Sequence, residues 1–422
     1  MTFLLGVNIV CALLGLLQFA YTLAVLQPAD FAVIGVLAAI GGVVTGLLDV
    51  KLADLTTKLF FAVPKGEPKR RGALLAASLM LHAAMGLVSA ALVFGAASVL
   101  ATRFLTTAHE SWWIAVMAAR LASVYPMAAL TTFLRLLGVF QASGWLRLGT
   151  QVVTTATTIL ALRASPDLTG FFVGAAAATG LTLAIALAVV TPQVRRALGG
   201  PLLQVPAWDT IWAFLTSGNF IAGGSLAGMS KLLSRSCDVL VVATLGNDTL
   251  TGLYRVARQG YDTLAGLTDA VHQFYTPTIV DCIQHERWAE FAKHRGRLML
   301  IGSAAASGAV LGSWLLLRPL ATAYYPHYGP ALPAFEVFAG LLVVTLGIHG
   351  WLWPTLIASG RIGWFGVLGI AGAVAQLAAM ALLAWAGRLD AATAAGAAWI
   401  MAAVGYGPVL IERVLRRSGL AG

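Results

Sequence analysis

Charged side chains gather in two apolar stretches of the sequence, residues 211–244 and 250–283, where a membrane helix would normally have none. They include Lys231, Arg235 and Asp238 in the first stretch and Arg255, Arg258, Asp262 and Asp269 in the second. Helical spacing places the charges of each stretch on one face. A charge near the centre of a bilayer costs about 2.5–3.5 kcal/mol, so we expect both faces to line a protein interior or a wet cavity.

The short connection 245–249 predicts that the two stretches run antiparallel as neighbouring helices. Residues whose numbers add to about 493 then lie at equal depth, given the constant rise per residue of a helix. The equal-depth pairs are Asp238 with Arg255, Lys231 with Asp262, and Arg235 with Arg258. The first two are candidate ion pairs. The third places two guanidinium groups about 12–14 Å below the outer edge, and Arg120, in stretch 111–137, is expected at a similar depth.

Three arginines near mid-membrane, Arg120, Arg235 and Arg258, could form an anion site, because guanidinium binds phosphate bidentately and stays charged. The alternative is structural, with Arg235 reaching Asp238 and Arg258 reaching Asp262 along their own helices. Buried ion pairs can be retained for packing specificity. Lys231, Asp238, Asp262 and Asp269 are candidates for ion pairs or for coupling to an ion, although Asp269 lies near the inner end, where helix capping is an alternative.

The composition predicts that these charges belong to a membrane protein. Of 422 residues, 59% are hydrophobic and only 10% are charged, whereas about 25% are charged in an ordinary soluble domain. A soluble protein with so few charges could not cover its surface. This excludes a soluble enzyme, a secreted domain and a nucleic-acid-binding protein, although the net charge is +10 and the pI about 9.9.

Interruptions by charges, prolines and turn residues predict an all-α membrane protein with about twelve transmembrane helices. The expected spans are residues 3–26, 31–61, 72–101, 111–137, 149–162, 170–190, 211–244, 250–283, 298–323, 331–358, 364–387 and 393–411. The fifth is short for a span. The longest break in hydrophobicity predicts a first six-helix bundle at 1–190, a cytoplasmic linker at 191–210 and a second six-helix bundle at 211–422.

Two further patterns concern the arrangement of the spans. A shift of 220 in residue number aligns Val36, Gly46, Leu47 and Asp49 with Val256, Gly266, Leu267 and Asp269, which favours an internal duplication. If the N-terminus is cytoplasmic, 18 of the 27 Lys and Arg residues fall on the inner side and four on the outer side. The positive-inside rule therefore predicts that both termini are cytoplasmic.

The sequence contains no catalytic motif or metal-ligand cluster. There is no nucleophile elbow, His-Glu-x-x-His pair or phosphate-binding loop. The three cysteines, Cys11, Cys237 and Cys282, are far apart in the sequence. We therefore expect no enzyme and no cofactor.

Several motifs of the middle third are similar to those of a known family. They are the run Leu232-Leu-Ser-Arg-Ser-Cys-Asp238, then Leu245-Gly246, then Gly252-Leu-Tyr-Arg-Val-Ala-Arg258, and then Tyr275-Thr-Pro277. The chain resembles the polysaccharide-exporter branch, the O-antigen (Wzx-type) flippases, of the multidrug, oligosaccharidyl-lipid and polysaccharide (MOP) flippase superfamily. The stretches 26–31 and 324–329 resemble an early and a later turn of the same family.

The resemblance implies a V-shaped pair of six-helix bundles that moves an undecaprenyl-pyrophosphate-linked oligosaccharide across the bacterial cytoplasmic membrane by alternating access. It implies that Arg235, Arg255 and Arg258 contact the lipid diphosphate; Arg120 is added from its depth. Coupling to H⁺ or Na⁺ is compatible with this family. The expected partners are the lipid-linked glycan, membrane lipids and, transiently, polysaccharide assembly proteins, with the chain itself a monomer.

Two alternative functions are left open by the sequence. A cation-coupled multidrug extrusion transporter would need carboxylates for a cationic substrate, and here Asp238, Asp262 and Asp269 are matched or outnumbered by nearby Lys and Arg. A membrane glycan polymerase or ligase would need a substantial outer loop, and the predicted outer loops are all short. The sequence therefore favours a flippase over both alternatives.

Overall fold

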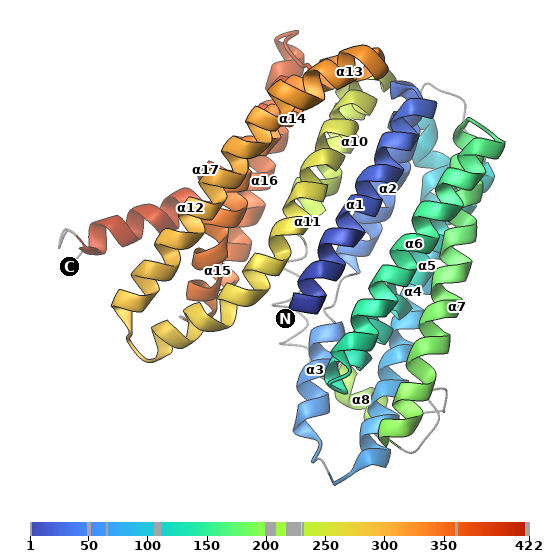
Figure 1. Ribbon diagram of the computed structural model, residues 1–422, viewed down its shortest axis with the longest axis vertical. Helices are drawn as coiled ribbons and strands as arrows, with labels where there is room; N and C mark the ends of the chain where they lie inside the picture. The colour runs from blue at the N-terminus through green and yellow to red at the C-terminus, as the bar shows by residue number, and fades with distance from the viewer. Residues whose placement is uncertain are drawn as a thin grey trace. The chain divides into compact units, whose positions relative to one another are not determined.

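The chain forms helices joined by short connections throughout the part that the structure describes (Figure 1). The computed structural model describes residues 2–48, 52–64, 66–104, 111–198, 208–216, 229, 232–358 and 362–417. Eight helical segments in these ranges are long and apolar enough to cross a membrane. The protein is therefore an all-helical, multi-pass membrane protein, as the composition predicted.

The elements fall into two compact units, which we describe separately. Inner and outer ends are named after the predicted orientation, in which both termini are cytoplasmic. The first unit comprises Met1–Leu26, Ile40–Thr102 and His109–Gly228, and the second comprises Gln27–Ala39, Arg103–Ala108 and Met229–Gly422. The first unit contains α1 (Thr2–Val25), the inner part of α2 (Pro28–Leu47), α3 (Leu52–Ala62), α4 (Pro68–Phe104), α5 (Ser111–Leu136), α6 (Phe140–Ala164), α7 (Leu168–Leu198) and α8 (Trp208–Leu215). The division into bundles at 190 and 211 stays a prediction, and residues 199–207 of the expected linker lie outside the described residues.

The second unit contains the outer part of α2 and all later elements. These are η1 (Leu233–Cys237), α10 (Asp238–Leu245), α11 (Asp248–Gln284), α12 (Trp288–Gly312), η2 (Ser313–Leu317), α13 (Arg318–Tyr324), η3 (Pro326–Ala331), α14 (Leu332–Gly340), η4 (Val343–Ile348), α15 (His349–Ala358), α16 (Ile362–Trp385) and α17 (Ala391–Arg417). The segments η1, η2 and η4 are π-helical. A π-helical turn holds more residues than an α-helical turn and often occurs at functional sites. One of them, η1, directly precedes Asp238.

Helix boundaries recur with the same numerical shift that the sequence shows. α2 begins at Pro28 and α11 at Asp248, and α4 begins at Pro68 and α12 at Trp288. In each case the second starting number exceeds the first by 220. The agreement supports the predicted internal duplication.

Two helices, one in each unit, end in the same type of turn. Gly138 after α5 and Gly387 after α16 have positive φ angles of 74° and 66°. In both places the next amide donates to a carbonyl five residues earlier, at 2.9 Å and 2.8 Å, which is the hydrogen bond of a Schellman cap. Glycine is favoured there because it adopts positive φ without steric strain. The two turns therefore end their helices sharply.

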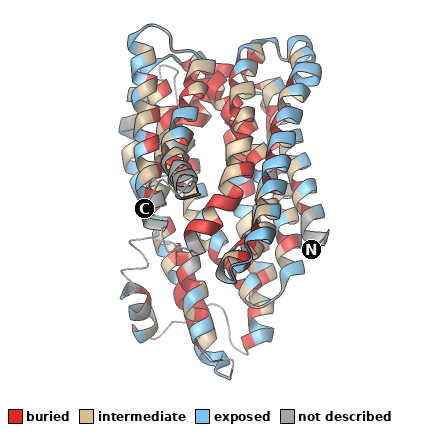
Figure 2. Cartoon of the chain, turned by 90° about the vertical axis from the view of Figure 1, so that its left-hand side faces the viewer, coloured by how far each residue is buried: buried red, intermediate tan, exposed pale blue. Residues whose placement is uncertain are grey.

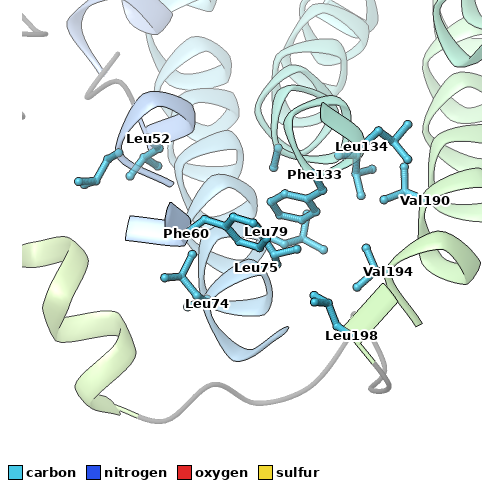
Figure 3. Close-up of a cluster of buried hydrophobic side chains, with 14 of the residues drawn as sticks. Leu52, Phe60, Leu74, Leu75, Leu79, Phe133, Leu134, Val190, Val194 and Leu198 are labelled. Atoms are coloured by element: carbon cyan, nitrogen blue, oxygen red, sulfur yellow. The ribbon is translucent and has the colours of Figure 1, made fainter. Parts of the chain in front are cut away.

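A cluster of aliphatic and aromatic side chains holds the inner end of the first unit together (Figure 3). Leu75 of α4, Phe133 and Leu134 of α5 and Val190 of α7 are all fully buried there. Phe214 of α8 belongs to the same cluster and is 1% exposed. The inner ends of α3, α4, α5, α7 and α8 are thus fixed by one core.

The second unit has a corresponding core at the inner ends of α11, α12 and α15. Ile279, Leu298 and Leu352 are fully buried, and Phe291 and Trp351 contact each other edge to face, with ring centroids 6.2 Å apart. This core fixes the inner half of α11. The charged residues that concern the site lie in its outer half.

Several expected spans differ from the helices observed, and three of them show the reason. The fifth, expected at 149–162, is the full-length α6, because Arg147 is exposed and does not end the helix. The second, expected at 31–61, is two helices, α2 and α3. The start of the seventh, expected at 211, belongs to α8, whose Trp208 and Trp212 are exposed while Phe214 is buried. Hydrophobicity alone therefore misplaced boundaries where a helix is amphipathic.

Exposed positions, pale blue in Figure 2, run along the helices of the chain, and many of them are large and apolar. On α6, for example, Leu160 is 65% exposed and Val152 is 45% exposed. Lipid tails are as apolar as these side chains, so such faces are typical of a membrane protein. In α6 the polar residues Gln151 and Thr158 lie elsewhere on the helix and take part in hydrogen bonds.

A pair of matched leucine substitutions tests this assignment of core and lipid-facing positions. Leu134→Ala removes a fully buried side chain and should lower the free energy of unfolding by about 2–5 kcal/mol. Leu160→Ala, on the exposed face, should change it by less than about 0.5 kcal/mol. Denaturant unfolding of both purified variants in detergent measures the difference, and equal losses would contradict the assignment.

Candidate functional site

The site is built on α10 and α11, two helices joined by a capped turn. Gly246 ends α10, and the Asn247 side chain accepts a hydrogen bond from the Leu250 amide at 2.8 Å. Asparagine at this N-cap position satisfies one of the amides that the first turn of α11 leaves unbonded. The short connection brings the charged residues of both helices together, as the sequence predicted.

Asp238, the first residue of α10, is fully buried and has several polar partners. Its Oδ1 accepts a hydrogen bond from the Val239 amide at 2.7 Å, and its Oδ2 accepts one from the Tyr254 hydroxyl at 2.8 Å. Arg258 Nη1 lies 3.5 Å from the same Oδ2. A buried carboxylate is tolerated only when it is paired and hydrogen-bonded, and Asp238 meets both conditions.

Arg258 lies between two carboxylates and two aromatic rings. Besides Asp238, its Nε is 3.6 Å from Asp262 Oδ1, one turn further along α11. Its guanidinium carbon is 5.4 Å from the centroid of the Tyr261 ring and 5.2 Å from that of Phe338. The residue is only 5% exposed. The structure therefore contains the Arg258–Asp262 pair of the structural alternative, together with a second pair to Asp238.

The expected pair between Asp238 and Arg255 is wrong. The equal-depth pairing missed by one residue. The residue that bonds Asp238 across the two helices is Tyr254, next to Arg255 in the chain. Successive residues of a helix differ by about 100° in direction. Tyr254 therefore faces α10 while Arg255 faces another way, and Arg258, one turn on from Tyr254, supplies the cation.

Arg255 instead contacts the outer part of α2 and an amide on its own helix. Its Nη2 donates to Gln259 Oε1 at 2.8 Å. Its aliphatic stem lies against Gly35, so that a Cβ added at Gly35 would be 2.9 Å from Arg255 Cγ. Unlike Arg258, Arg255 has no carboxylate within ion-pair distance among the described residues. Its hydrogen-bond partner is neutral, and Asp262 and Asp238 act on its charge only from beyond ion-pair distance.

The structure does not place the remaining predicted site residues beside Arg258. Arg120 is an exposed residue of α5 in the first unit, and its carbonyl accepts a hydrogen bond from the Ser123 hydroxyl at 2.7 Å. Lys231 lies outside the described residues, as do the side chains of Arg235 and Asp269. The structure thus brings together Asp238, Arg258 and Asp262, with Arg255 on the same helix.

The predicted site residues did not include Tyr254, Gln259 or Gly35, nor the rings of Tyr261 and Phe338 beside Arg258. Tyr254 lies inside the family-like run at 252–258 but has no charge. Gly35 and Arg255 differ in number by the repeat shift of 220, so the repeat could have pointed to Gly35. Gln259 is at i+4 from Arg255, a spacing that favours a hydrogen bond along a helix.

Comparison with known proteins finds similarity in structure alone, since no family profile and no characterised protein matches the sequence. An inward-facing multidrug resistance MATE family transporter of the MOP superfamily matches 97% of this chain and 95% of its own, with a TM-score of 0.74 and 15% identity. The lipid II flippase MurJ, in an inward closed conformation, matches 97% of this chain and 88% of its own, with a TM-score of 0.73 and 11% identity. The fold is that of the MOP superfamily.

A third MOP-type structure, the MATE transporter VcmN of Vibrio cholerae, matches 99% of this chain and 96% of its own, with a TM-score of 0.64 and 13% identity. The superfamily fold predicted from the sequence motifs is therefore confirmed over nearly the whole chain. These structural neighbours are transporters and a flippase, not enzymes. At such low identity they establish the MOP fold, and the choice of substrate depends on this chain's own residues.

Removing Arg258 should destabilise the MOP fold of this chain more than removing an exposed arginine. In Arg258→Gln the buried Asp238 keeps its charge but loses its cation, and breaking such a pair costs about 3–5 kcal/mol. Arg287→Gln is the control, because Arg287 is paired with Asp281 and Glu290 but is 42% exposed, and exposed pairs contribute about 0–1 kcal/mol.

Thermal unfolding in detergent measures both losses. Adding Asp238→Asn to Arg258→Gln should restore part of the lost stability, because the uncompensated charge is then gone. Equal effects of the two single substitutions would contradict a buried, charge-balanced Arg258.

Proposed function

We propose that this protein is a flippase that moves an undecaprenyl-pyrophosphate-linked oligosaccharide across the bacterial cytoplasmic membrane by alternating access. The observation that supports an anionic substrate is the distribution of charges among the membrane helices. The carboxylates described near Arg258 are paired with it, whereas Arg255 is bonded to a neutral amide. Positive charge is thus more available to a substrate than negative charge.

The first unit supports the same conclusion. Its five long helices, α1, α4, α5, α6 and α7, contain no Asp or Glu between their ends. α5 instead carries Arg120 near its middle. A cationic substrate or a coupling cation would find no carboxylate on these helices.

In the second unit, three carboxylates are paired with arginines of the same unit. Asp238 and Asp262 are within 3.5 and 3.6 Å of Arg258, and Glu336 of α14 is 3.7 Å from Arg318. A cationic drug would have to displace an arginine to reach any of the three. This disfavours multidrug extrusion, the alternative to which the name of one structural neighbour, a multidrug resistance transporter, points.

We assign different roles to the two arginines of α11. Arg258 holds α10 and α11 together through its two carboxylates, and Arg255 contacts a phosphate of the lipid diphosphate. Guanidinium suits this role because its fork can donate two parallel hydrogen bonds to one phosphate. Arg120 and Arg235 remain candidates for further phosphate contacts, and Lys231 and Asp269 for ion pairs or coupling.

Replacing Arg255 should reduce translocation of the lipid-linked glycan without unfolding the protein. A charge-assisted hydrogen bond contributes about 1.5–3 kcal/mol, so Arg255→Ala should lower the rate about 10- to 100-fold at low substrate concentration. Arg255→Lys should retain part of the wild-type rate, because lysine keeps the positive charge but lacks the guanidinium fork. The assay is transfer of a fluorescent undecaprenyl-pyrophosphate-linked sugar between leaflets of proteoliposomes.

The control is Arg163→Ala, at the exposed outer end of α6. It should translocate at the wild-type rate. A wild-type rate for Arg255→Ala as well would refute the phosphate contact. Proteoliposomes that extrude a cationic dye but not the lipid-linked sugar would instead favour the multidrug alternative.

A further inference from the structure

The outer part of α2 and α11 approach each other closely within the second unit. A Cβ added at Gly252 of α11 would lie 1.7 Å from the Pro28 carbonyl oxygen, so the two backbones are almost in contact there. Two helical turns further along α2, a Cβ added at Gly35 would lie 2.9, 3.2 and 3.3 Å from Cγ, Cδ and Cβ of Arg255. The stem of Arg255 therefore rests directly on the backbone of α2.

The outer part of α2 is closely packed around Gly35. Val33 and Val36, on either side of Gly35, are fully buried. Phe31 is 6% exposed and contacts Tyr328 edge to face, with ring centroids 5.7 Å apart. Protein interiors are close-packed and transmit strain. A methyl group at position 35 would consequently displace the side chain of Arg255, starting at its base.

The other end of Arg255 is held by Gln259. Its Nη2 donates to Gln259 Oε1 at 2.8 Å, one helical turn further along α11. An arginine side chain has many rotamers, and fixing one of them in advance lowers the cost of binding. Gly35 restrains the stem and Gln259 restrains the guanidinium, while the charge of the guanidinium remains available.

The internal repeat places Gly35 at the position equivalent to Arg255. Positions 35 and 255 differ in number by 220, as do the corresponding helix starts Pro28 and Asp248. The two repeats thus have Gly and Arg at equivalent positions that face each other. A second arginine at position 35 would bring two cations together and fill the space that the first one needs.

We propose that Gly35 and Gln259 are positioning residues that hold the Arg255 guanidinium for the phosphate of an anionic, lipid-linked substrate. The proposal rests on the anion-binding role of Arg255 given above. Gly35 acts by leaving space for the Arg255 stem, and Gln259 by accepting one of its five N–H bonds. The remaining N–H groups still form a fork for phosphate.

The test measures binding of undecaprenyl pyrophosphate to the purified protein in detergent, together with KM and kcat of translocation in proteoliposomes. Gly35→Ala should weaken binding about 3- to 10-fold and raise KM with little change in kcat, because loss of pre-organisation affects binding. Gln259→Leu should have the same effect from the other end of the side chain. In the Arg255→Ala background, neither change should weaken binding further.

Gly41→Ala is the matched control, because it lies on the same helix and its added Cβ would be 2.9 Å from a methyl carbon of Leu121 instead of Arg255. It should bind undecaprenyl pyrophosphate like the wild type. If Gly35→Ala lowers the folded yield, Gln259→Leu carries the test, since it adds no atom against α2.

The outcomes separate the two proposals. If Arg255→Ala binds the probe as tightly as the wild type, the proposed anion contact is wrong. If Arg255→Ala weakens binding but Gly35→Ala and Gln259→Leu do not, the positioning roles are overturned and the anion contact stands. The positioning roles are also overturned if Gly35→Ala weakens binding equally with and without Arg255.

Discussion

The need to balance charge inside the membrane determines the arrangement of α10 and α11. Arg258 is almost fully buried, and it is stable there because Asp238 and Asp262 lie within 3.5 and 3.6 Å of it. Tyr254 adds a hydrogen bond to Asp238 and so links the two helices at the same level. Since these contacts hold α10 against α11, they also fix the direction in which Arg255 points. The proposed phosphate contact thus depends on residues that do not themselves touch the substrate.

This arrangement explains why charged residues on one helix can have different roles. Arg255 and Arg258 are three residues apart on α11, yet the first contacts Gly35 and Gln259 while the second contacts two carboxylates. An arginine with two acidic neighbours contributes mainly to the fold. An arginine bonded to a neutral neighbour keeps a positive electrostatic potential to which an anion is attracted. The burial and the partners of an intramembrane charge decide between these roles, because its mere presence is compatible with both.

The sequence predicted much of the fold because hydrophobicity and charge are strong signals in a membrane protein. It predicted the all-helical architecture, the superfamily fold and an internal repeat that the helix starts support, and it predicted that α10 and α11 are neighbours. It misplaced α6 and α8, where exposed Arg147 and the amphipathic pattern of Trp208 and Phe214 obscured the helix limits. The Asp238–Arg255 pair failed for a different reason, since residue numbers give depth along a helix but not the direction of a side chain. Gly35 has no side chain at all, and its proposed role follows only from the close approach of two helices.

The facing pair of Gly35 and Arg255 has a consequence for the history of the chain. A gene that arises by doubling begins with the same residue at both equivalent positions. Two arginines there would repel each other, and two glycines would leave no cation, so neither symmetrical ancestor could hold a single guanidinium between α2 and α11. If the two halves arose by duplication, they must therefore have diverged at this position before the present arrangement arose. From then on, an exchange of the two halves of the gene would no longer be neutral.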